Sequence, residues 1–268
     1  MGIETDIAAD WHASLAALAW QVDLGVSDII GEAPLDRYDL PEPVKLPDPV
    51  AAAPNPAPPR AVAPAAPTAD MAIAAATAAA SGAQSLGDLR EALARFDQLE
   101  IKRGARNLVF GDGNPQARVL ILTDAPDVEE DREGRPCVGS KGEMLDRMFA
   151  AIGLSRSAEA AQAIYITPSL PWRAPHREPS ADEIAIIRPF VARHIALINP
   201  AVVVLLGNDA LQLALNSSGI LRHRGTWAQA FDKPVLAMTH PAYLQRNPAA
   251  KREAWADLLS LQAKLRGL

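Results

Sequence analysis

Cysteine is nearly absent from this chain of 268 residues, in which Cys137 is the only one. A single cysteine excludes an intramolecular disulfide framework and any metal cluster held by several thiolates. No apolar run reaches the roughly 20 residues that a membrane-spanning helix needs, although 49% of residues are apolar. The N-terminus also lacks a basic region followed by an apolar stretch and a cleavage site. We therefore expect a cytoplasmic protein with no membrane segment and no metal.

Positive charge is scarce in the first part of the chain and in slight excess afterwards. Residues 1–100 carry 5 Lys and Arg against 15 Asp and Glu, whereas residues 101–268 carry 21 against 17. The net charge of −6 therefore hides an acidic arm in front of a mildly basic part. A small positive excess is compatible with weak binding of nucleic acid but does not by itself require it.

The composition divides the chain into three parts. Residues 1–40 contain a short amphipathic helical pattern and are expected to be a docking segment for a protein partner. Residues 41–84 are rich in Pro and Ala, which favours an extended, semi-rigid linker with some helix in the Ala-rich stretch 71–80. Residues 85–268 are expected to be the folded domain, so the other two parts form a flexible N-terminal arm in front of it.

Four short apolar runs in the predicted domain have the character of β-strands. They are Ala117–Leu122, Ala163–Ile166, Ala201–Leu206 and Val235–Met238. Each is followed by a helical pattern, the second only after a Pro-rich loop. This alternation predicts a three-layer α/β/α fold around a central, mostly parallel four-stranded sheet. Ligands of such open sheets bind at the carboxyl ends of the strands, where the chemically suggestive residues of this chain lie.

Apolar stripes mark the helices that should cover this sheet. The first helix of the domain is expected to have Ser85 as its N-cap. At the C-terminus, Trp255, Leu258, Leu259 and Leu265 form a stripe that we expect to pack against the sheet.

Six segments of the domain carry a family resemblance. They read TDAPDVEED, GRPCVGSKGEMLDRM, YITPSLPWRAPHREPSADE, LLGNDA, RHRGTW and HPAYLQR. In this order they resemble the motifs of the uracil-DNA glycosylases, most closely the bacterial iron–sulfur branch called family 4. The resemblance runs from about Phe96 to the C-terminus. It implies a monomeric protein of base-excision repair that acts on DNA, hydrolysing the N-glycosidic bond of uracil or of another altered base.

The resembled family holds a [4Fe–4S] cluster with four cysteines. The positions that correspond to those cysteines are all apolar here: Phe96, Leu99, Trp172 and Ile187. No thiolate is available at them, and a small hydrophobic cluster can anchor the same segments by burying apolar area. We therefore expect no iron–sulfur cluster and no other cofactor.

The resemblance also implies the residues of the site. The catalytic residues would be Asp124, in the first motif, and His240, in the last. The base pocket would contain Ala125, Pro126, Asp127, Cys137 and Pro168.

Three of the pocket positions depart from the family. Asp127 replaces a glycine and adds bulk and a charge that repels phosphate. Cys137 replaces the aromatic residue that stacks on uracil, and Pro168 replaces the asparagine that recognises the uracil edge. Only His240 is as the family has it, so ordinary uracil excision is not expected.

Five further residues are predicted to contact DNA: Gly207, Arg222, Arg224, Leu244 and Arg246. In this set, Leu244 suits a wedge in the minor groove and Arg246 suits a phosphate contact.

Each of these residues also has a plainer interpretation. In that interpretation Asp124 caps a turn, Cys137 is an inert, partly buried thiol, and His240 has a structural role. The arginines are then ordinary solvated charges.

Three functions are compatible with the sequence. The first is a DNA glycosylase with impaired or altered base excision, and the second is a non-catalytic module that binds DNA or a repair partner. The third is a pocket used for a nucleotide or another small molecule. The first accounts best for a set of motifs that keeps its order although the pocket positions have changed.

Overall fold

The computed structural model describes residues 11–23, 69–174, 177 and 179–268. The chain forms two compact units, residues 1–62 and 63–268. In the first unit, helix α2 (Trp11–Asp23) confirms the predicted helix. The remainder of the predicted docking segment, and the predicted linker as far as residue 68, lie outside the described residues.

The described part of the second unit contains a six-stranded sheet in the order β1-β3-β2-β4-β6-β5. Its strands are β1 (Asp112–Gly113), β2 (Val119–Thr123), β3 (Ile164–Pro168), β4 (Val202–Leu206), β5 (Trp227–Ala230) and β6 (Lys233–Met238). The four central strands are parallel and are the four that the apolar runs predicted. Strands β1 and β5 add an antiparallel pair at each edge, so the sheet is wider than predicted.

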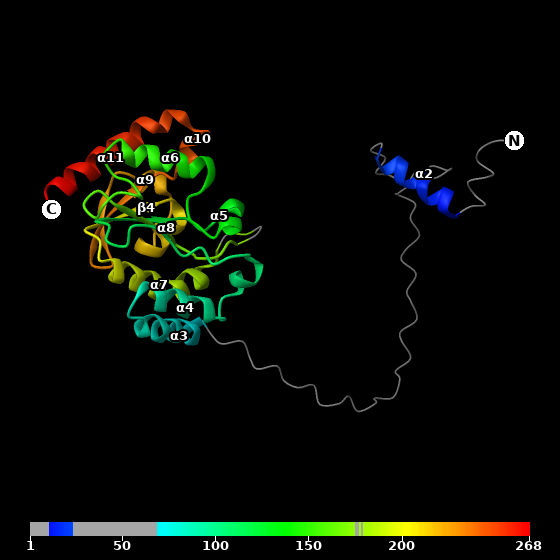
Figure 1. The fold of residues 1–268 in the computed structure, drawn as a ribbon, viewed down its shortest axis with the longest axis horizontal. Helices are drawn as coiled ribbons and strands as arrows, with labels where there is room; N and C mark the ends of the chain where they lie inside the picture. Colours follow the sequence, from blue (N-terminus) through cyan, green and yellow to red (C-terminus); the bar gives the residue numbers. More distant parts are fainter. Residues whose placement is uncertain (1–10, 24–68, 175–176, 178) are drawn as a thin grey trace, which may run out of the picture. The chain divides into compact units, whose positions relative to one another are not determined.

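Helices lie on both faces of this sheet (Figure 1), which gives the predicted α/β/α layers. The helices are α3 (Ala69–Gly82), α4 (Leu86–Arg95), η1 (Glu100–Gly104), α5 (Val128–Glu133), α6 (Gly139–Ala150), α7 (Ala181–Ile198), α8 (Asn208–Leu215), α9 (Ile220–His223), α10 (Pro241–Arg246), η2 (Pro248–Ala250) and α11 (Lys251–Arg266). Helices α3, α4 and α7 lie on one side, and α6, α10 and α11 lie on the other. None of the helices in the described residues is long and apolar enough to cross a membrane.

Strand β2 shows how the sheet builds a core on both faces. Side chains alternate along a strand, so Leu120 and Leu122 join the buried cluster that contains Phe190 of α7. Val119 and Ile121 point the other way and join the cluster beneath α6 and α11. The strand is buried on both sides, which explains why its sequence is a continuous apolar run.

Helix α3 belongs to the folded unit and not to the predicted linker. It packs along α7, and Ala72, Ala76 and Ala80 are buried in the contact. Their four-residue spacing puts three small side chains on one helical face, so the two helices can approach closely. Arg193 of α7 also donates from Nε and Nη2 to the carbonyl oxygen of Ala83, at 2.9 and 2.7 Å. The predicted domain boundary at residue 85 is therefore too late, although Ser85 is the N-cap of α4 as predicted.

A truncation series tests this boundary. We expect a chain that begins at Ala69 to unfold cooperatively, and a chain that begins at Ser85 to be less stable by about 2–4 kcal/mol, the scale of exposing a few apolar side chains. Urea unfolding followed by circular dichroism measures the difference. Equal stabilities of the two truncated proteins would show that α3 contributes nothing to the core.

Helix α11 buries only part of the predicted stripe, since Leu258 is buried and Leu265 packs against the core but the other two residues do not. Leu258 and Leu261 are buried, whereas Trp255 and Leu259 are each 43% exposed. The buried face also contains Asp257, a charged residue that an apolar stripe does not reveal.

Candidate functional site

The carboxyl ends of the strands bring several predicted site residues together. Thr123 ends β2, Pro168 ends β3 and pairs with it in register, and His240 follows β6. The Thr123 hydroxyl lies 3.2 Å from Nε2 of His240 and 3.9 Å from Sγ of Cys137. A buried threonine, to which the sequence assigned no role, therefore connects two of the predicted pocket residues.

His240 is held in one tautomer by its own helix. Its Nδ1 accepts the backbone N–H of Ala242 at 3.2 Å, so in the neutral ring the proton is on Nε2, which donates to Thr123. Burial lowers the pKa of His240 to about 4. At neutral pH this side chain is therefore an uncharged hydrogen-bond donor at the edge of the sheet.

The Asp124 carboxylate is directed to the N-terminus of α8. Its Oδ1 accepts the backbone N–H of Asp209 at 2.8 Å, and Oδ2 of Asp209 accepts the N–H of Ala125 at 3.1 Å. Gly207 has a φ of 103°, and a Cβ there would overlap the Asp124 carboxylate. Asp124 therefore caps helix α8. Gly207 leaves space for the Asp124 carboxylate, and this packing role differs from the DNA contact predicted for the glycine.

The position of Asp124 has a consequence for stability at different pH. Burial is the main cause that raises the pKa of Asp124 to about 7, and the negative charge of Asp209 contributes to the same shift. Between about pH 4, the unfolded value, and pH 7 the folded state keeps a proton that the unfolded state has lost. This group's contribution to stability therefore falls as pH rises through that window.

We expect Asp124→Asn, which keeps an oxygen acceptor for α8, to gain about 3 kcal/mol over the parent protein between about pH 5 and about pH 8. Urea unfolding at a series of pH values measures this difference. Asp182→Asn, at an exposed aspartate of α7, is the matched control and should follow the parent. A constant difference between Asp124→Asn and the parent at all pH values would contradict the assignment.

Asp127 stabilises the loop after β2. It is the N-cap of α5, and its Oδ1 accepts the backbone N–H groups of Glu129 and Glu130 at 2.9 and 3.0 Å. Its φ of −88° needs no glycine. Lys141 lies 2.6 Å from Oδ2, and its hydrogen bond lowers the pKa of Asp127 although burial acts in the opposite direction. The lysine also offsets the repulsion of phosphate that the sequence suggested.

Glu130 connects the two motifs around this loop. Its carboxylate is buried and accepts the backbone N–H of Cys137 at 2.5 Å and that of Asp127 at 2.8 Å, while Lys141 donates to it at 2.6 Å. Sequence reasoning missed this residue. The signal was present, because Asp127 and Glu130 have the spacing of a capping box.

Cys137 is an inert, buried thiol, in agreement with the plainer interpretation of this residue. It is 2% exposed, and burial together with the charge of Glu130 raises its pKa to about 12. Its φ is 50°, and Arg156 donates to its carbonyl oxygen at 2.8 Å. The backbone of this position is thus held on both sides of the residue.

A second buried network supports β3 immediately before Pro168. The Thr167 hydroxyl donates to the carbonyl of Phe110 at 2.9 Å and lies 3.4 Å from Nδ1 of His194. Nε2 of His194 lies 3.0 Å from the Tyr165 hydroxyl. Burial lowers the pKa of His194 to about 3, so this ring is a neutral structural link between β3 and α7.

The predicted DNA contacts fall into two groups. Arg222 and Arg246 are exposed on α9 and α10. Arg224 instead makes two contacts with the buried Asp257, at 3.1 and 2.5 Å, and is a structural residue. Leu244 is fully buried against α6 and α11, so the predicted wedge is wrong for this side chain.

The four positions equivalent to cluster cysteines lie in one apolar cluster. Phe96, Leu99, Trp172 and Ile187 are all buried in it. Ile187 and Pro168 border a small cavity of about 10 Å³, which has room for no more than about one water molecule. Among the described residues no group of His, Cys, Asp or Glu is arranged to hold a metal. The residues present therefore do not fit a [4Fe–4S] cluster.

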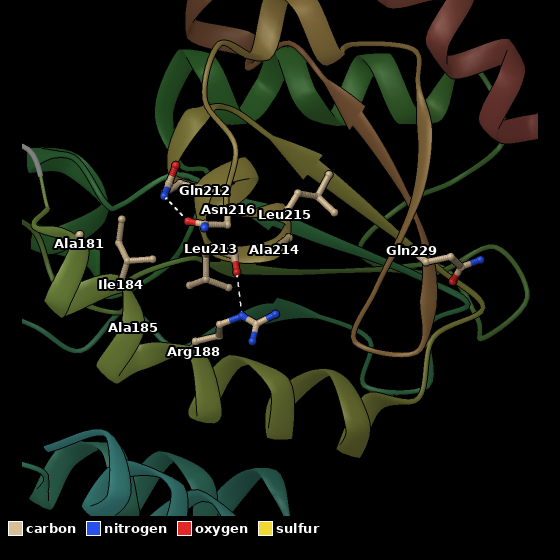
Figure 2. Close-up of a pocket in the computed structure, with 10 residues that line it drawn as sticks. All are labelled: Ala181, Ile184, Ala185, Arg188, Gln212, Leu213, Ala214, Leu215, Asn216 and Gln229. Carbon is tan, nitrogen blue, oxygen red and sulfur yellow. Dashed lines mark hydrogen bonds between the residues drawn. The ribbon is translucent and has the colours of Figure 1, made fainter. Parts of the chain in front are cut away.

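A groove of about 500 Å³ lies elsewhere, between α7, α8 and β5 (Figure 2). Arg188 donates from Nε to the carbonyl of Leu213 at 3.1 Å, and Gln212 donates to Asn216 at 2.8 Å. None of the residues that line this groove was predicted for the site. The groove is separate from the sheet edge that carries the motifs.

Comparison with known proteins shows the family to which the chain belongs. Residues 110–259 match the family model of the Uracil DNA glycosylase superfamily. The chain is 30% identical over 186 residues to a Type-4 uracil-DNA glycosylase of Archaeoglobus fulgidus, covering 65% of this chain and 90% of that protein. Enzymes of the same name from Sulfurisphaera tokodaii and Thermotoga maritima are 31% and 34% identical, over 63% and 53% of this chain and 79% and 73% of their own lengths. The matched range contains the whole sheet and leaves out α3 and α4.

Proposed function

Because this chain belongs to the uracil-DNA glycosylase superfamily, in its type-4 branch, we propose that it is a glycosylase-like DNA-repair protein whose base excision is impaired or altered. The observation that carries this proposal is the composition of the sheet edge. Pro168 stands where an amide would recognise the base, and Cys137 offers a buried thiol in place of an aromatic face.

The chemistry of excision explains why these two positions matter. A glycosylase takes its target base out of the stack and binds it by stacking and by hydrogen bonds to its edge. Pro168 has neither a side-chain amide nor a backbone N–H. Sites that recognise a substrate by hydrogen bonds lose both rate and discrimination when the donor is removed, by roughly 100-fold or more for a donor that acts in the transition state.

Two features of an excision site are nevertheless present. The Nε2–H of His240 can stabilise a departing anionic base if its hydrogen bond to Thr123 is broken, because a neutral imidazole can still donate a hydrogen bond. Asp124 lies at the same edge, but its carboxylate already binds the backbone of α8. A carboxylate in that position is poorly placed to orient water, which supports slow excision.

The second candidate function is a DNA-binding module without catalysis. The observation that favours it is the contrast between exposed and engaged residues. Arg222 and Arg246 are exposed on α9 and α10, whereas Asp124, Cys137 and His240 are bound to neighbouring groups. Such a module would bind DNA and leave its bases intact.

A nicking assay tests the proposal. Single- and double-stranded oligonucleotides with uracil or another altered base are incubated with the protein, and abasic sites are then cleaved. The proposal expects slow or no release of uracil. Release of another base that His240→Ala abolishes would identify altered excision, and DNA binding without any release would favour the second function. Fast uracil release that depends on His240 would overturn the proposal.

We also propose that the protein works without the iron–sulfur cluster of its branch. The purified protein should be colourless and free of iron, because Phe96, Leu99, Trp172 and Ile187 provide no thiolate. Iron analysis and the absorbance at about 400 nm measure this, after purification and after incubation with iron and sulfide. Stoichiometric iron with a broad absorbance band would contradict the prediction.

A further inference from the structure

A groove of about 410 Å³ borders the loops that follow β2 and β3. Four of the residues that line it are arginines: Arg103, Arg106, Arg132 and Arg173. We call it the arginine groove. Two of these residues, Arg103 and Arg106, lie before the range that matches the family model, and none of the four was predicted to contact DNA.

The positive charge of the arginine groove is largely available to a ligand. Arg103, Arg106 and Arg132 are exposed. Arg132 lies 3.6 Å from Glu133, but an exposed pair of this kind is weak. The groove therefore offers three guanidinium groups that solvent, and so a ligand, can reach.

The acidic lining residue of the groove is already neutralised within the protein. Asp131 is buried, and its Oδ1 accepts the backbone N–H groups of Arg106 and Asn107 at 2.8 and 3.1 Å. Its Oδ2 lies 3.5 Å from Nε of Arg173. Asp131 thus holds the segment of Arg106 against α5 and does little to repel an anion.

The location of the groove connects it to the candidate site. Val128, which lines it, directly follows the N-cap Asp127, and Arg173 lies in the loop that begins after Pro168. Val128 is 64% exposed and provides an apolar surface among the arginines. A strand of nucleic acid offers this combination, because its phosphates are anionic and its sugars and bases are partly apolar.

We propose that the arginine groove binds the sugar–phosphate backbone of the DNA strand whose base enters the site. This inference rests on the proposed function, since it takes the strand ends as the place where DNA is bound. The planar guanidinium fork matches the oxygens of a phosphate. Contacts of this kind set the position of a protein on DNA without selecting a sequence.

The test is a charge-matched pair of full-length variants. The first is Arg103→Gln/Arg106→Gln/Arg132→Gln. The control is Lys233→Gln/Lys264→Gln/Arg266→Gln. It removes the same amount of charge far from the carboxyl ends of the strands, where β6 begins and α11 ends. Figure 1 shows α5 and the end of α11 on opposite sides of the domain. Both variants should unfold at the temperature of the parent.

Binding is measured by fluorescence anisotropy with an undamaged single-stranded oligonucleotide, from about 50 to about 200 mM salt. The slope of log K against log salt is negative, and loss of three phosphate contacts should make it less steep by about 2 and weaken binding about 100-fold at about 100 mM salt. The control should change binding by less than about threefold, since charges far from the bound strand are screened by salt.

The outcomes separate this inference from the proposed function. If neither variant changes binding, or both weaken it equally, the arginine groove is not the binding surface, whatever the excision assay gives. If the groove variant alone binds weakly while the parent releases no base, the inference stands and the glycosylase activity fails. If the parent does not bind DNA at any salt concentration, the inference is overturned.

Discussion

Replacing Pro168 by asparagine should raise the rate of uracil excision by about tenfold to hundredfold, since one transition-state donor contributes on that scale. The exchange restores an amide at the carboxyl end of β3, where the family's base-recognising residue stands. The exchange should be tolerated. Strand β1 pairs with β3 only at Tyr165 and Ile166, so on the side of β3 that faces β1 no ladder hydrogen bond depends on residue 168. Single-turnover excision on uracil-containing single-stranded DNA measures the effect.

Two control variants separate recognition of the base from a gain in backbone freedom. Pro168→Ala removes the proline without adding an amide and should excise uracil no faster than the parent. His240→Ala should change the parent little but should abolish the gain when it is combined with Pro168→Asn. If Pro168→Ala and Pro168→Asn raise the rate equally, backbone freedom limits excision and recognition of the base does not.

Replacing Glu130 by alanine should lower the free energy of unfolding by about 3–5 kcal/mol, the cost of removing one partner from a buried ion pair. The change leaves the backbone N–H groups of Cys137 and Asp127 without their acceptor. It also takes one of two carboxylate partners from the largely buried ammonium group of Lys141, which keeps only Asp127. Urea unfolding at neutral pH measures the loss. Glu129→Ala, on the exposed side of the same helix, is the matched control and should cost less than about 0.5 kcal/mol. Equal losses in the two variants would show that the buried carboxylate has no special role.

The central sheet could be predicted from the sequence because its four parallel strands are buried on both faces. Burial on both faces produces continuous apolar runs, and these were visible. The edge strands were not visible, since β1 is only Asp112–Gly113 and β5 reads WAQA. Helix α3 was assigned to a linker because its buried face is alanine, which composition does not distinguish from a solvated Ala-rich stretch.

The site was predictable in position but less so in the state of its side chains. The order of the motifs predicts that Asp124, Pro168 and His240 follow or end strands, and the structure brings all three to the carboxyl ends of the parallel strands. Burial is a property of packing that spacing does not reveal, so the sequence alone predicts a wedge at Leu244, which the structure buries. The partner of Arg224 lies 33 positions away at Asp257, and no local pattern connects the two.

The buried thiol has a practical consequence. Thiol reagents attack the thiolate, and a side chain that is 2% exposed with a pKa near 12 scarcely forms one at neutral pH. Since Cys137 is the only cysteine, the natural chain is already a background on which an introduced cysteine can be labelled selectively. A fluorophore attached through Val128→Cys, at the rim of the arginine groove, would report the arrival of a DNA strand directly.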